Sequence, residues 1–174
     1  VVRHGVGDLT VAAGGLVRGD WMNVGSYAGS AGEVLVTGAG SRFESVDGEM
    51  NIGRYGSGTV TVQNGATMGA NTVAIGHFAG SDGKALVNGA GSQLVTEGTD
   101  NAIQVGREGT GILAVQNGGT VKTLALIVGR EGDGTVTIEG AGSAIIVSND
   151  EGLNGGIYAQ EAGFVRVACN DGSD

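Results

Sequence analysis

The chain has 174 residues, a length that fits one domain with a core large enough to fold. Glycine occupies 37 positions and proline none, which excludes collagen because collagen needs abundant proline and a strict triplet period. The net charge of −9 opposes binding to nucleic acid and insertion into an anionic membrane surface. The single cysteine, Cys169, excludes an intramolecular disulfide.

An internal repeat organises the sequence from one end to the other. The tetrapeptide GAGS occupies residues 38–41, 89–92 and 140–143, so that successive copies begin 51 residues apart. A related element, AGG at 13–15, NGA at 64–66 and NGG at 117–119, lies between these copies. We therefore divide the chain into repeats of about 13–63, 64–116 and 117–167, each with two similar halves.

Each half-repeat carries three apolar segments in chain order. The first is a pair of residues two positions apart, which on a strand point to one face. These pairs are Leu9 and Val11, Val34 and Val36, Val60 and Val62, Ala85 and Val87, Leu113 and Val115, Val136 and Ile138, and Val165 and Val167. The second segment has one apolar residue, at Val17, Phe43, Met68, Leu94, Val121 and Ile145.

The third segment is another pair, followed directly by glycine. Its members are Met22 and Val24, Met50 and Ile52, Val73 and Ile75, Ile103 and Val105, and Leu126 and Val128. Three strands and three glycine-rich corners would close one coil, and stacking the coils would bury their apolar faces together. The sequence thus predicts an all-β fold: a single-stranded parallel β-helix (β-solenoid) of three strands per coil and about six to seven coils, spanning 1–174 as one segment.

Two other folds fit the sequence less well. No sustained apolar pattern at helical spacing is present, and the frequent glycines would cost about 1 kcal/mol each inside a helix. A propeller blade usually carries a recurring aromatic signature, whereas this chain has one tryptophan, Trp21.

The segments GSGTVTVQNGATM with VAIG, and GSDGKALVNGAGSQL with IQVG, resemble repeats in the passenger regions of bacterial autotransporters. The resemblance covers about residues 5 to 167. It implies a parallel β-helix that a C-terminal outer-membrane barrel carries to the bacterial cell surface, where such passengers act as adhesins or as shafts. The chain shows no apolar run of signal-peptide length and no barrel, so we expect it to be a fragment of a longer passenger.

The resemblance implies a non-enzymatic extracellular shaft or adhesin segment without catalytic residues, cofactor or metal. Its expected partners are a host cell surface, a matrix protein or glycan, or identical neighbours. The alternative is a β-helix enzyme that degrades polysaccharides, as a lyase or a glycoside hydrolase, or a fibre module of a phage or secreted protein. An enzyme should interrupt the apolar rows with clustered polar residues, and the sequence shows no such interruption.

Acidic residues gather between the second and third apolar segments of the GAGS halves. They are Glu44, Asp47, Glu49, Glu97, Asp100, Asp150 and Glu151. One interpretation is a strip that contacts cations or a basic ligand, and the other is a solvated edge that resists aggregation. The tripeptide Arg18, Gly19 and Asp20 lies at the corresponding corner of the first coil and matches the integrin-recognition motif when such a motif lies on an exposed turn.

Arginines follow three of the glycines that end the third segment. Arg54, Arg107 and Arg130 lie at these positions, and Glu108 and Glu131 follow two of them. We expect a charged row along one corner, with pairs worth about 0–1 kcal/mol each. His4 and His77 hold unrelated repeat positions, which gives neither of them a predicted metal or acid–base role.

Overall fold

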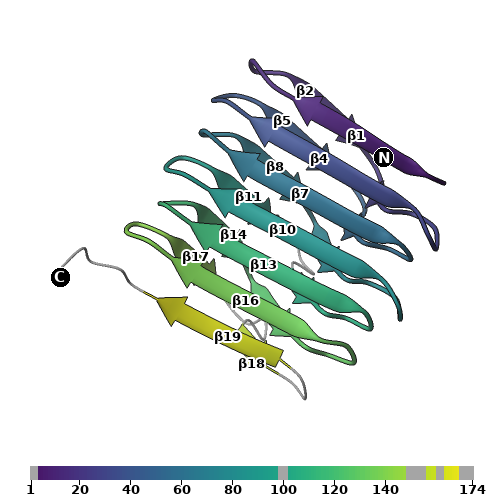
Figure 1. Cartoon of the computed structure of the whole chain (residues 1–174). Helices are drawn as coiled ribbons and strands as arrows, with labels where there is room; N and C mark the ends of the chain where they lie inside the picture. Colours follow the sequence, from purple (N-terminus) through teal and green to yellow (C-terminus); the bar gives the residue numbers. More distant parts are fainter. Residues whose placement is uncertain (1–3, 98–101, 148–155, 160–162, 169–174) are drawn as a thin grey trace.

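The computed structural model describes the backbone of residues 4–97, 102–147, 156–159 and 163–168, and the side chains of those up to Val147. Within these ranges the chain forms strands, turns and bends and no helix, so none of the described residues belongs to a helix able to cross a membrane. The chain winds through six coils of three strands each, and a last strand continues the stack (Figure 1). The predicted β-solenoid is confirmed.

Three parallel sheets form the sides of the solenoid. Sheet A contains β1 (Val6–Val11), β4 (Ala31–Thr37), β7 (Ser57–Gln63), β10 (Asp82–Asn88), β13 (Thr110–Gln116), β16 (Gly134–Glu139) and β19 (Gly163–Ala168). Sheet B contains β2 (Leu16–Gly19), β5 (Arg42–Ser45), β8 (Thr67–Ala70), β11 (Gln93–Thr96), β14 (Thr120–Thr123) and β17 (Ala144–Val147). Sheet C contains β3 (Met22–Val24), β6 (Glu49–Ile52), β9 (Thr72–Ile75), β12 (Ala102–Val105), β15 (Ala125–Val128) and β18 (Gly156–Ala159).

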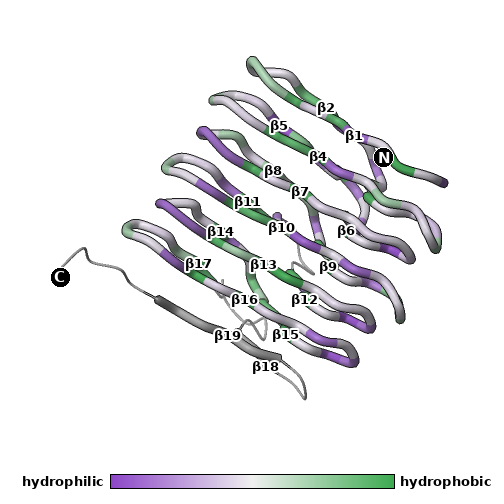
Figure 2. The backbone as a smooth tube through the Cα atoms, viewed as in Figure 1, coloured by the Kyte–Doolittle hydropathy of each residue, from purple (hydrophilic) through white to green (hydrophobic). Residues whose placement is uncertain are grey.

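The register pairs each predicted apolar position with its counterpart in the next coil. Val34 lies opposite Val60, Phe43 opposite Met68, and Met50 opposite Val73. Of these residues only Val34 is measurably exposed, at 2%, because successive side chains of a strand alternate between the inside and the outside. Figure 2 shows the apolar colour along the strands and the polar colour at many of the corners. The three rows together form one continuous dry interior.

The glycines that follow the third apolar pair bend the chain from sheet C toward sheet A. Gly76, for example, has a φ of 72°, a left-handed conformation that residues with a side chain rarely adopt. A Cβ atom at Gly76 would also lie 2.2 Å from the carbonyl oxygen of Thr110. Glycine is therefore required here both by the backbone conformation and by the close approach of a neighbouring strand.

The serine of each GAGS turn joins neighbouring coils. The Ser92 hydroxyl donates to the carbonyl of Asn88 at 2.8 Å and accepts a hydrogen bond from the Gly65 N–H at 3.1 Å. Ser41 makes the same two bonds with Thr37 and Gly14, and Ser143 makes them with Glu139 and Gly118. The repeated tetrapeptide thus satisfies one backbone donor of the preceding coil in each long repeat.

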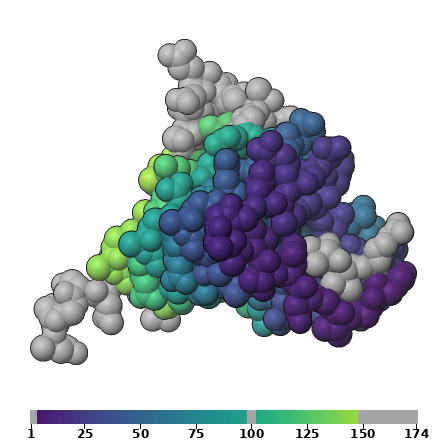
Figure 3. Space-filling view, turned by 90° about the horizontal axis from the view of Figure 1, so that it is seen from above, coloured from purple at the N-terminus to yellow at the C-terminus, as the bar shows by residue number. Residues whose placement is uncertain are grey.

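Seen from above, the N-terminal coil lies in front of the coils that follow it (Figure 3).

Candidate functional site

A groove on the outer face of sheet B contains three of the residues singled out from the sequence. It has a volume of about 320 Å³. We call it the sheet B groove, and its lining consists of Arg18, Arg42, Glu44, Ser45, Val46, Thr67, Gly69, Ala70, Asn71, Gln93, Val95 and Glu97. The outward positions of β5, β8 and β11 form its floor, because Glu44 pairs with Gly69 and Gly69 pairs with Val95 in the register.

Glu44 holds two arginines at one end of this groove. Its Oε2 atom accepts hydrogen bonds from Nε of Arg18 at 3.0 Å and from Nη2 of Arg18 at 2.8 Å. Its Oε1 atom pairs with Nη2 of Arg42. The side chain of Glu44 is 10% exposed, whereas those of both arginines are 54% exposed. The carboxylate is therefore covered, and the guanidinium groups face solvent.

This geometry changes the interpretation of the acidic strip and of the tripeptide. Glu44 is enclosed by two cations, so it does not offer a free carboxylate to a basic ligand. Arg18 and Gly19 belong to β2, and Asp20 follows in a bend, so the tripeptide lies at the end of a strand and not on a free turn. Asp47 and Glu97 are exposed. Asp100, Asp150 and Glu151 lie outside the described residues.

Glu49 belongs to a second group of polar side chains, on the outer face of sheet C. Its Oε1 atom lies 3.3 Å from Nη1 of Arg107, and its Oε2 atom lies 3.4 Å from Nδ1 of His77. Nδ1 of His77 also contacts Oδ1 of Asn51, whose Nδ2 donates to Oδ1 of Asn23 at 3.0 Å. We call Asn23, Glu49, Asn51, His77 and Arg107 the sheet C cluster.

Burial shifts both titratable groups at the centre of the sheet C cluster toward their neutral forms. It raises the pKa of Glu49, and the nearby cations Arg107 and Arg54 and a hydrogen bond from Asn51 oppose this rise. Burial, together with the positive charges of Arg107 and Arg54, lowers the pKa of His77 to about 4. His77 is therefore neutral at pH 7, and its contact with Glu49 is not an ion pair.

Sequence reasoning did not bring these groups together. Glu49 and Arg107 are 58 residues apart, and His77 occupies a repeat position that holds arginine in other coils. One feature of the sequence could have indicated the site. Arg54, His77 and Arg107 each follow a corner glycine, so His77 stands where equivalent coils have arginine. The side chains of His77 and Arg107 extend over the outer face of sheet C to reach Glu49. The spacing of the residues along the sequence did not indicate this direction.

Aromatic rings stack along the neighbouring position of the same corner. The rings of Tyr55 and Phe78 lie 4.3 Å apart at an angle of 8°, and His77 stacks on Phe78 at 3.9 Å. The rings of His4 and Tyr27 stack at 4.5 Å. The stacked rings pack neighbouring coils together at this corner, while Tyr27 and Tyr55 remain 40% and 42% exposed.

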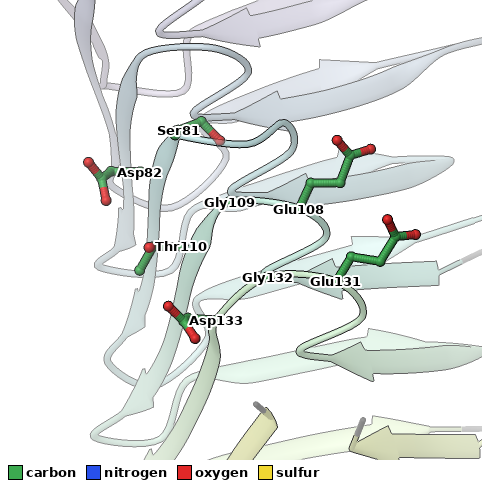
Figure 4. Close-up of a pocket in the computed structure, with 9 residues that line it drawn as sticks. Ser81, Asp82, Glu108, Gly109, Thr110, Glu131, Gly132 and Asp133 are labelled. Carbon is green, nitrogen blue, oxygen red and sulfur yellow. The ribbon is translucent and has the colours of Figure 1, made fainter. Parts of the chain in front are cut away.

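In the later coils Glu108 and Glu131 take the position of these rings. A hollow of about 470 Å³ is lined there by Ser81, Asp82, Glu108, Glu131 and Asp133 and by glycines of the turns. Figure 4 shows Glu108 and Glu131 extending from one side of the corner, with Asp82 and Asp133 on the other side. No three acidic, histidine or cysteine side chains come close enough to hold a metal ion anywhere in the described ranges.

Comparisons of the chain with protein-family models, with curated proteins and with solved structures give no match.

Proposed function

We propose that this chain is a non-enzymatic structural segment of an extracellular bacterial surface protein of the autotransporter type, which forms a shaft and mediates or presents adhesion. The observation that carries the proposal is the unbroken register: sheet A pairs strand to strand from β1 to β19 without a change of direction. Each coil contacts chiefly its neighbours, so coils add length without changing the cross-section. A stack of this kind suits a spacer that holds a contact surface away from its anchor.

The interior supports the same proposal. Every residue of the central inward row from Phe43 to Val121 is fully buried and apolar. The polar groups of the sheet B groove and of the sheet C cluster lie outside this core. The polar side chains of these two sites therefore lie on the outer faces and do not interrupt the regular apolar interior.

The proposed partners are a host cell surface, a matrix protein or glycan, or a second copy of the chain. The test uses the purified 174-residue chain coupled to beads. Bead retention on cultured epithelial cells and on immobilised matrix components is measured beside the release of reducing ends from a panel of polysaccharides. Retention without cleavage supports the proposal, and cleavage of a polysaccharide overturns its non-enzymatic part.

One observation favours the alternative of a polysaccharide-degrading enzyme. The sheet C cluster places a carboxyl group of raised pKa, that of Glu49, beside Arg107 and His77. Glycosidic hydrolysis ordinarily uses two carboxyl groups. Within the described residues, Glu49 contacts Arg107, His77 and Asn51, and none of these three side chains carries a carboxyl group. If the chain does cleave a polysaccharide, the loss of that activity in Glu49→Gln would assign it to this cluster.

A further inference from the structure

One glycine on the outer face of sheet B has no conformational reason to be glycine. Gly69 lies inside β8 and does not have a positive φ. A Cβ atom placed on it would meet nothing closer than 3.9 Å, the nearest atoms being Cγ of Glu44 and the carbonyl oxygen of Val95. By contrast, a Cβ on Gly83 would lie 2.2 Å from the Ile52 carbonyl oxygen. Neither the backbone nor the packing excludes a side chain at Gly69.

Such a glycine weakens the strand that contains it. Glycine inside a strand is less stable than a β-branched residue, and it often marks a place where a ligand or another backbone approaches closely. No other part of the described chain comes within van der Waals contact of the missing side chain, apart from the neighbours in its own row. Gly69 lines the sheet B groove, between Glu44 and Val95 of the adjacent strands.

The charge of this face differs from that of the whole protein. The strands of sheet B carry Arg18, Arg42 and Lys122 against Glu44, or +2, in a chain of net charge −9. The lining of the groove itself has Arg18 and Arg42 against Glu44 and Glu97, which sum to zero, so its charge is divided between its two ends. Two of the cations stand together at one end of the groove. Lys122 lies in the same outward row as Gly69, two coils further along the stack. An anionic group is therefore favoured at the end of the groove that holds the half-exposed Arg18 and Arg42.

The remaining groups favour a polysaccharide over a peptide. Thr67, Asn71 and Gln93 line the groove with small hydrogen-bonding side chains that suit hydroxyl groups. Strands β5, β8 and β11 are each paired on both sides, so a peptide has no free strand edge to join. We propose that the sheet B groove binds a carboxylate-bearing polysaccharide, which pairs with Arg18 and Arg42 and runs over Gly69 along the stack. This inference names a ligand for the adhesive role proposed above and rests on it.

The deciding variant is Gly69→Val. Valine suits a strand, and its Cβ would meet no atom closer than 3.9 Å on the floor of the groove, so the melting temperature should stay the same or rise while binding is weakened. Affinity of the full chain for polygalacturonate and for hyaluronate is measured by calorimetry, with neutral dextran and poly-glutamate as comparison ligands. We expect Gly69→Val to weaken binding of the acidic polysaccharide at least tenfold and Gly69→Ala to weaken it less.

Two charge variants test where along the groove the carboxylates of the ligand bind. Arg42→Gln leaves Glu44 paired with Arg18 and should weaken binding about tenfold, an effect that added salt should mimic. Glu97 lines the groove beyond the end of β11, and Glu97→Gln should strengthen binding severalfold by removing a repulsive charge.

Several outcomes would overturn the inference. They are wild-type affinity in Gly69→Val, equal binding of dextran, binding of poly-glutamate in place of the polysaccharides, or no binding of either acidic polysaccharide. The bead assay separates this inference from the proposed function. Retention of Gly69→Val beads at the wild-type level would leave the adhesive role standing and remove the groove from it.

Discussion

Arg107 reaches across two coils to Glu49, with Nη1 of the arginine 3.3 Å from Oε1 of the glutamate. The strand between them, β9, has two outward residues: Thr72 lies opposite Glu49, and Ala74, which is fully buried, lies opposite Asn51 and Gln104. A small residue in the middle coil is thus fully covered although its position points outward.

Removing the arginine should leave the partly buried carboxylate of Glu49 without its closest cation. We expect Arg107→Met, which keeps much of the apolar stem, to lower the free energy of unfolding by about 1–3 kcal/mol at pH 7. The loss should shrink near pH 4, because the raised pKa of Glu49 allows that group to become neutral. Urea denaturation at both pH values measures the effect.

Arg130→Met is the matched control for Arg107→Met. The Arg130 and Glu131 side chains are 46% and 65% exposed, so this variant should change the stability by less than about 1 kcal/mol. Equal losses in the two variants would contradict the interpretation of the sheet C cluster.

His77 should make the protein less stable as the pH falls from about 6.5 to about 4. Its pKa is about 4 in the folded state, against 6.5 for the unperturbed group. Within this window the unfolded chain binds a proton at His77 that the folded chain does not bind, so stability is lost as the pH decreases.

The contribution of His77 is isolated by comparing wild type with His77→Gln. The melting temperature of the wild type should fall relative to that of His77→Gln as the pH is lowered from about 6.5 to about 4. Glu49 has the opposite dependence, since a raised carboxyl pKa favours the folded state at low pH. Repeating the comparison in Glu49→Gln removes that opposing effect. A difference independent of pH in both backgrounds would refute the assignment.

Ser92 should contribute more to stability than its size suggests. Ser92→Ala leaves the partly buried Gly65 N–H and the Asn88 carbonyl without the hydroxyl that joins them, at an expected loss of about 1–3 kcal/mol. Ser57→Ala, at an exposed position, should be nearly neutral. Denaturant midpoints of the two variants provide the comparison, and the prediction fails if they coincide.

Two corner glycines separate backbone strain from steric overlap. Gly76 and Gly80 have φ values of 72° and 78°. A Cβ at Gly80 has open space, whereas one at Gly76 meets the Thr110 carbonyl oxygen at 2.2 Å. We expect Gly80→Ala to cost about 1 kcal/mol and Gly76→Ala to cost several times as much. Similar unfolding curves for the two variants would show that the chain relaxes around the added methyl group.

A charge in the interior should disrupt several coils at once. Val62 is 1% exposed, so Val62→Asp buries a carboxylate without a partner and should lose several kcal/mol. Thr61→Asp, which points outward from the same strand, should lose about 1 kcal/mol or less. Circular dichroism distinguishes the two, and a native spectrum and melting curve for Val62→Asp would be incompatible with the inward row.

The sequence by itself determined the solenoid, its three strands per coil and the partner of nearly every apolar residue. It could do so because a coil has no core of its own, and the same spacing must therefore recur wherever one coil buries another. Leu94, for instance, could be matched with Met68 before and Val121 after from spacing alone, and the register agrees.

Only the tertiary structure decided what the polar side chains do. Arg18, Glu44 and Arg42 meet through stacking of the first two coils, and Glu49 meets Arg107 across two coils. The charged outward side chains are long, and the space open to them depends on which outward residues of adjacent coils are small, as Ala74 and Gly69 are. Repeat spacing fixes where the backbone lies. The contacts of a surface side chain depend on its neighbours in several coils, and the pattern of any one repeat position does not show which neighbours these are.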